Sequence, residues 1–170
     1  MKTPILIIAL SFISLTGMTQ KMNQIKVDDL VEGEILFGQV NLEGLNGDLC
    51  SAWFKPEFEG YKVDMKRVSE IKSKDLSGLK MTLVLGTWCH DSHQQVPRMI
   101  KILESLKFPM EELELYAMDT YKKAPGVDIK AIDVKLVPTL IIYKGGKELG
   151  RIIESPKVSL EADLLEILEN

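Results

Sequence analysis

The feature that most constrains the fold is a short apolar run, MTLVLGTW, at residues 81–88. A run of this length without polar alternation is typical of a central strand buried on both faces of a sheet. The stretch from about Cys89 to Lys107 then predicts a helix. Its inner face would carry five apolar side chains at helical spacing, Val96, Met99, Ile100, Leu103 and Leu106. The run therefore indicates the centre of an α/β sheet.

The elements after residue 81 are predicted in the order strand, helix, strand, helix, strand, strand, helix. The later ones are a strand at 113–118, a short helix at 126–134, a hairpin at 138–144 and 147–153, and a closing helix at 159–168 with Ser159 as its N-cap. A strand–helix–strand unit implies a parallel, right-handed crossover, and the hairpin adds an antiparallel edge. We therefore expect one α/β domain with a central mixed β-sheet flanked by helices on both faces.

The first residues have the features of a signal peptide. Lys2 precedes an apolar stretch from Ile5 to Leu15, and small and polar residues follow, with a suitable cleavage site near Thr19–Gln20. A membrane span needs about 20 apolar residues, so this stretch is too short to be one. We expect residues 1–19 to be removed, the mature chain to have no stable membrane insertion, and the protein to be periplasmic or secreted.

Composition excludes some classes of partner. The chain has 170 residues, a net charge of −4 and a pI near 5.3, and it has no dense Lys/Arg run. This argues against nucleic acid and anionic membranes as partners. The two cysteines, Cys50 and Cys89, are too few for a disulfide framework, so a reactive thiol is the more informative interpretation in an exported chain.

Cys89 lies where the predicted central strand gives way to the helix. Unpaired amides and partial positive charge at a helix N-terminus stabilise a thiolate there, which favours a nucleophilic cysteine. Trp88 would cover one side of its sulfur. The alternative is a buried, inert cysteine, which is a common fate for a free thiol.

Four motifs in order resemble the thioredoxin family. They are the apolar strand, WCHDS at 88–92, Pro97 eight residues after Cys89, and Val137-Pro138-Thr139 before the hairpin. The likeness covers about residues 62–170 and leaves 20–61 as an N-terminal extension with an aromatic-rich segment. The segment 62–170 is also similar to a group of thioredoxin-like bacterial envelope proteins. The resemblance implies a thioredoxin-like fold, a nucleophilic Cys89, a cis Pro138, and a Val137 backbone that pairs with a substrate chain.

Two residues depart from the family pattern. Ser92 stands where thioredoxins have the second, resolving cysteine, and Leu83 stands where they have a buried acid. Ser92 cannot form a disulfide, although its hydroxyl can donate a hydrogen bond to the Cys89 thiolate. Cys89 would then form mixed disulfides with protein or small-molecule thiols, in reactions of the isomerase, de-thiolation or reductase type, without a cofactor. Cys50 is a possible resolving partner, or else a core cysteine.

Other interpretations stay open at this point. His90 and Asp91, between Cys89 and Ser92, would have opposite effects on a neighbouring thiolate. Cys89, His90 and His93 could bind zinc or copper, but no distant ligand completes a metal site, so we expect none. Since Ser92 replaces the second cysteine and Leu83 replaces the buried acid, the sequence also suits a redox-inactive binding or chaperone-like module on the same fold.

Overall fold

A computed structural model describes residues 21–169, so the signal peptide predicted at 1–19 lies outside the described residues. Six strands form one sheet in the order β1-β2-β4-β3-β5-β6. The strands are β1 Gln24–Asp28, β2 Gly33–Val40, β3 Leu79–Leu85, β4 Leu113–Ala117, β5 Thr139–Lys144 and β6 Lys147–Ile153. The helices are α1 Leu42–Asn46, α2 Asp48–Gly60, α3 Met65–Lys72, α4 His90–Leu106 and α5 Leu160–Glu169, with a short 3-10 helix at Met110–Glu112.

Strand β3 lies inside the sheet, between β4 and β5. It pairs in parallel with β4 and antiparallel with β5, so that Leu83 stands opposite both Leu115 and Leu140. Strand β6 continues the antiparallel edge from β5. The predicted mixed α/β sheet, its parallel β3–α4–β4 unit and its closing hairpin are therefore confirmed.

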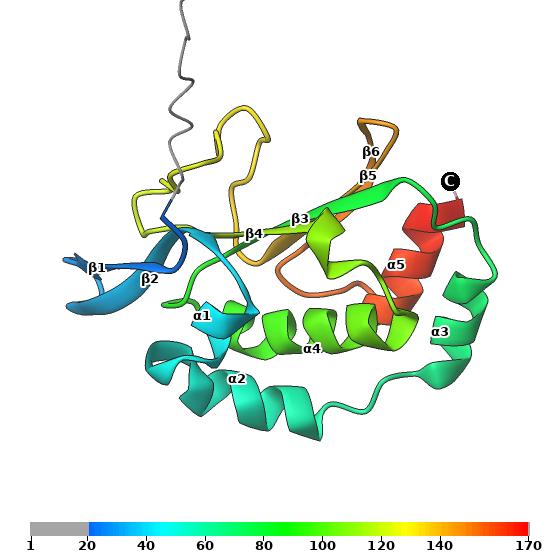
Figure 1. Cartoon of the computed structure of the whole chain (residues 1–170), viewed down its shortest axis with the longest axis horizontal. Coiled ribbons are helices and arrows are strands. Elements are labelled where there is room, and N and C mark those ends of the chain that lie inside the picture. The colour runs from blue at the N-terminus through cyan, green and yellow to red at the C-terminus, as the bar shows by residue number, and fades with distance from the viewer. Residues whose placement is uncertain (1–20, 170) are drawn as a thin grey trace, which may run out of the picture.

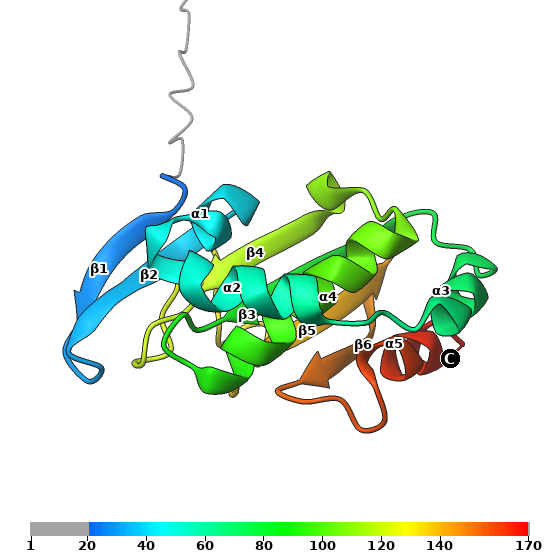
Figure 2. The same ribbon diagram turned by 90° about the horizontal axis from the view of Figure 1, so that it is seen from below.

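The five helices of the described residues lie along one face of the sheet, as Figures 1 and 2 show from two directions, so the expectation of helices on both faces is corrected. Helix α4 lies nearest the centre of that face, and α2 packs along it. The five side chains predicted on the inner face of α4 are all buried, at 0–5 % exposure. Ser159 caps α5 as predicted, because its Oγ accepts a hydrogen bond from the Ala162 amide.

The other face of the sheet is covered by the segment 119–138, and the helix predicted at 126–134 is wrong. That stretch forms successive turns, in which the Asp128 carboxylate accepts hydrogen bonds from the amides of Lys130 and Ala131. Its buried side chains, Ile129 and Val134, are five residues apart. Five residues turn an α-helix well past one full turn, so a helix would not aim both at the sheet.

These side chains complete a second apolar cluster, which we call the loop-face cluster. Its buried members are Val84, Tyr116, Met118, Ala124, Ile129, Val134, Val137 and Ile141. Trp88 and Cys89, at the end of β3, pack against it. The segment 119–138 therefore supports the region that the sequence singled out.

The residues before 62 contribute to the same sheet. Strand β2 pairs antiparallel with β4, and β1 forms the outer edge. Helix α2 buries Cys50 and Phe54 in the core on the helix face. The domain boundary expected between 61 and 62 stays a prediction. Within residues 21–169, no helix is long and apolar enough to cross a membrane.

Replacing Ile129 by alanine should destabilise the protein by about 2–4 kcal/mol, because it removes a buried side chain that holds the segment 119–138 on the sheet. The free energy of unfolding, measured with urea, checks this. Val158→Ala is the control, since Val158 is 81 % exposed and should change stability by less than about 0.5 kcal/mol. Equal effects of the two changes would contradict the packing described for Ile129.

Candidate active site

Cys89 stands at the junction of β3 and α4. Its amide donates to the Gly86 carbonyl at 2.9 Å, which closes a turn, and its own carbonyl accepts from the His93 amide at 3.1 Å. It is the N-cap residue of α4, which is 17 residues long, and its side chain is a half-buried free thiol. The half-buried thiol therefore lies at the N-terminal end of a long helix, directly after the central strand.

The loop before β5 brings a carbonyl to this sulfur. Cys89 Sγ donates a hydrogen bond to the Val137 oxygen at 3.2 Å, and the Val137–Pro138 peptide bond is cis. The loop is anchored on both sides, since Thr139 Oγ1 donates to the Leu136 carbonyl and the Glu154 amide donates to the Pro138 carbonyl. The structure thus brings Val137 to Cys89 although 48 residues separate them, and Pro138 and Thr139 follow Val137 directly.

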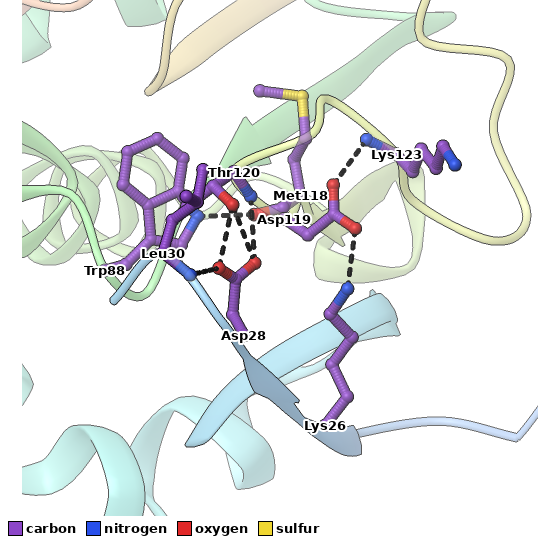
Figure 3. A network of polar contacts seen from close by, with 8 residues as sticks. All are labelled: Lys26, Asp28, Leu30, Trp88, Met118, Asp119, Thr120 and Lys123. Atoms are coloured by element: carbon purple, nitrogen blue, oxygen red, sulfur yellow. Dashed lines mark hydrogen bonds and ion pairs between the residues drawn. The ribbon is translucent and has the colours of Figure 1, made fainter. Parts of the chain in front are cut away.

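Trp88 is held next to Cys89 from two directions. Its Nε1 donates to the Met118 carbonyl at 2.8 Å, at the end of β4 (Figure 3). Its ring also lies against Gly86, where an added Cβ would come within 2.8 Å of the indole. Glycine at position 86 therefore leaves the space that the Trp88 ring occupies.

Ser92 is fully buried, one turn into α4. Its Oγ accepts a hydrogen bond from the Gly86 amide at 3.1 Å. Within residues 21–169, no hydrogen bond joins Ser92 to the Cys89 sulfur, so the interaction expected from the sequence is not formed in this structure. The Ser92 hydroxyl gives the Gly86 amide, just after β3, a hydrogen-bond partner, so its role in this structure is to stabilise the fold.

The two histidines have different surroundings. His90 is exposed, and Asp91 beside it is half-buried. His93 Nε2 lies 2.7 Å from the Thr87 carbonyl, and its ring stacks on Trp53 of α2 with centroids 4.4 Å apart. The described residues contain no group of three or more His, Cys, Asp or Glu side chains that could hold a metal ion.

Cys50 lies apart from this arrangement. It is fully buried in the helix-face core, whereas Cys89 packs against the loop-face cluster. Burial raises the pKa of the Cys50 thiol to about 12. The structure therefore does not bring the two sulfurs together, and it places Cys50 where a thiolate is disfavoured.

Two buried carboxylates near Trp88 were missed by the sequence analysis. Asp28 of β1 bonds to Leu30 and Thr120, and Asp119 bonds to Lys26 and to the Lys123 amide (Figure 3). Both carboxylates are only 1 % exposed. No local motif marks these residues. The one signal was Asp28 itself, an acidic residue at the end of a short alternating strand.

Comparisons with known proteins give one related sequence and several similar folds. The chain is 34% identical over 91 residues to Thioredoxin-2 of Saccharomyces cerevisiae, which covers 52% of this chain and 82% of that protein. No family model matches the chain.

Among the solved structures that match, one shares the general fold. A protein of unknown function from Pseudomonas aeruginosa superposes with a TM-score of 0.50 and 14% identity, over 69% of this chain and 81% of that one. Oxidized thioredoxin O2 from Arabidopsis thaliana gives a TM-score of 0.40 and 23% identity, over 61% of this chain and 85% of that one.

The thiols should differ sharply in reactivity. At pH 8 we expect one thiol, Cys89, to react in the native protein and the second, Cys50, only after unfolding. Cys50 should react at least about a hundredfold more slowly, because its thiolate is disfavoured and its sulfur has no exposed area. Stopped-flow titration with an aromatic disulfide reagent checks this, with Cys50→Ala as the control. Two fast thiols in the native protein would contradict the burial of Cys50.

Proposed function

Because the chain belongs to the thioredoxin family, we propose that it is a thiol–disulfide protein that uses Cys89 as its single nucleophile. Its substrates are protein or small-molecule disulfides, and it needs no cofactor. The observation that carries the proposal is the Cys89 thiol, half-buried at the N-terminus of α4 and 3.2 Å from the Val137 carbonyl.

The reaction balances as a thiol–disulfide exchange. The Cys89 thiolate attacks one sulfur of a substrate disulfide, that S–S bond breaks, and the other sulfur leaves as a thiolate. The product is a mixed disulfide between Cys89 and the substrate. A second thiolate must then attack this bond to free Cys89, and no electrons are gained or lost by the protein over the cycle.

The second thiolate comes from outside the chain. Ser92 has no sulfur, and Cys50 is buried in a different cluster with its pKa raised by burial. The resolving group is then the substrate's own second thiol, which gives isomerisation, or a small thiol, which gives de-thiolation. Both reactions suit a site with one nucleophile.

Export is part of this proposal. It rests on the basic start, short apolar stretch and small polar residues of the first 20 positions. An oxidising compartment would supply disulfide substrates. Protein purified from its own cells should begin near Gln20 by N-terminal sequencing; a chain that retains Met1 would contradict export.

A second candidate, a binding module without redox turnover, has two observations in its favour. Leu83 is fully buried between Leu115 and Leu140, and Ser92 is bonded to the Gly86 amide. At the two positions where the chain differs from the thioredoxin pattern, the side chains thus pack in the interior or bond to the backbone. In this alternative, partners would bind equally well to the Cys89→Ser variant.

Trapping distinguishes the two candidates. The protein is expressed in its own cells, which are quenched with acid, and its disulfide-linked partners are identified by non-reducing electrophoresis and mass spectrometry. Mixed disulfides should form with wild type and with Cys50→Ala, and should be absent with Cys89→Ser. Partners that co-purify with Cys89→Ser but form no disulfide with wild type would support the binding module and overturn the redox function.

Ser92→Cys provides a gain-of-function test. A second thiol one turn into α4 could attack the mixed disulfide, so this variant should release the substrate and form an internal disulfide. We expect trapped complexes to fall and insulin reduction to rise above wild type. Ser92→Ala, which has no thiol, is the matched control and should do neither. A Ser92→Cys variant that traps as much as wild type and reduces no more insulin would show that a thiol at position 92 does not reach the mixed disulfide at Cys89.

A further inference from the structure

We propose that Asp28 is a positioning residue for the Cys89 site: its carboxylate holds the segment 118–120, and through it the indole of Trp88. This inference rests on the proposed function of Cys89. It assigns a role in the site to β1, a strand outside the region that resembles thioredoxins.

The Asp28 carboxylate ties two segments together. It accepts hydrogen bonds from the Leu30 amide at 3.1 Å and from the Thr120 amide at 3.2 Å. The Thr120 hydroxyl lies 2.8 and 2.9 Å from its two oxygens. Both oxygens of a carboxylate that is 1 % exposed are thereby occupied by the turn after β1 and by the segment after β4.

Thr120 is two residues from the atom that holds the indole. The Met118 amide donates to the Leu85 carbonyl at 2.7 Å, and the Met118 carbonyl accepts from Trp88 Nε1 at 2.8 Å. Figure 3 shows the contacts of Asp28 with Thr120 and the hydrogen bond from Trp88 to the Met118 carbonyl. A displacement of the backbone at Thr120 would therefore move the acceptor of the Trp88 hydrogen bond.

A second contact from β1 to the segment 118–120 supports the role of the Asp28–Thr120 contact. Lys26, two residues before Asp28 and on the same face of β1, forms an ion pair with Asp119 at 2.7 Å. Asp119 also accepts from the Lys123 amide at 2.8 Å. Strand β1 thus pairs a cation and then a carboxylate with two successive residues of the segment 118–120.

The charge state suits this role. Burial alone would raise the pKa of Asp28, but hydrogen bonds from Thr120 and Leu30 and the nearby Lys26 ammonium outweigh it and lower that pKa. The group is therefore an ionised acceptor at neutral pH, as its three donors require.

Trp88 is the side chain through which Asp28 would influence the reaction. Trp88 and Cys89 pack against the same loop-face cluster, and Trp88 is only half-buried. A large disulfide substrate that reaches Cys89 would contact the indole, whereas a small alkylating reagent would not depend on it. Loosening Trp88 should therefore slow exchange with a polypeptide more than alkylation.

The test uses Asp28→Asn. The amide of asparagine cannot accept from all three donors, because its NH2 group would face one of them. In a Trp53→Phe background Trp88 is the one remaining tryptophan. We expect its emission maximum to shift to longer wavelength, and exchange with a peptide disulfide to slow by about fivefold or more. Alkylation of Cys89 by iodoacetamide should stay within about twofold of the parent.

Three further variants make the test decisive. Asp163→Asn is the matched control, since Asp163 is also a buried carboxylate that accepts from two amides, those of Lys157 and Val158. It should leave the Trp88 emission unchanged. Thr120→Val removes the Thr120 hydroxyl and should also shift the Trp88 emission. It serves as the test if Asp28→Asn does not fold. Trp88→Phe removes the indole and gives the rate of peptide exchange expected when its contribution is lost completely.

Each result supports or overturns the proposal. An unshifted Trp88 emission in folded Asp28→Asn and Thr120→Val, or equal shifts in Asp163→Asn, would overturn it. A shifted emission with unchanged peptide exchange would also overturn it. If wild type forms no mixed disulfide at all, the proposed function fails instead, and that outcome is separate because the emission shift does not depend on exchange.

Discussion

The antiparallel pairing of β3 with β5 is the constraint on which the site depends. Because Val84 stands opposite Thr139, the last residues of β3 and the first residues of β5 lie side by side at the same end of the two strands. The helix that follows β3 begins with Cys89, and the loop that precedes β5 ends with Val137 and Pro138. The hydrogen bond from the Cys89 sulfur to the Val137 oxygen is a direct consequence of this register.

The geometry also explains how the site differs from a dithiol centre. Ser92 occupies the second position of the motif, but its hydroxyl satisfies the Gly86 amide at the end of β3. Cys50 is in the core on the other side of the sheet. Of the two cysteines in the described chain, Cys89 is half-buried at the site and Cys50 is buried in the core, and for this reason the reactions that we propose take their second thiol from outside.

The strands before residue 41 contribute more to this site than their position in the sequence suggests. The Leu36 amide of β2 donates to Thr87 Oγ1, two residues before Cys89. Asp28 and Lys26 of β1 bind the segment that holds Trp88. On the opposite side of the site, Trp53 of α2 stacks on His93. The turn that contains Cys89 is thus fixed by residues far from it in the sequence.

The sequence alone determined the features that depend on local pattern. The apolar run of β3, the buried face of α4, the closing hairpin and the place of Cys89 at a strand-to-helix junction all follow from spacings of two to four residues. Only the tertiary structure decided the partner of Ser92, the contact of His93 with Trp53 and the irregular path of 126–134. It alone also showed the Asp28–Thr120 contact, which spans 92 residues. Such contacts depend on which strands become neighbours, and the spacing of residues along one segment does not contain that information.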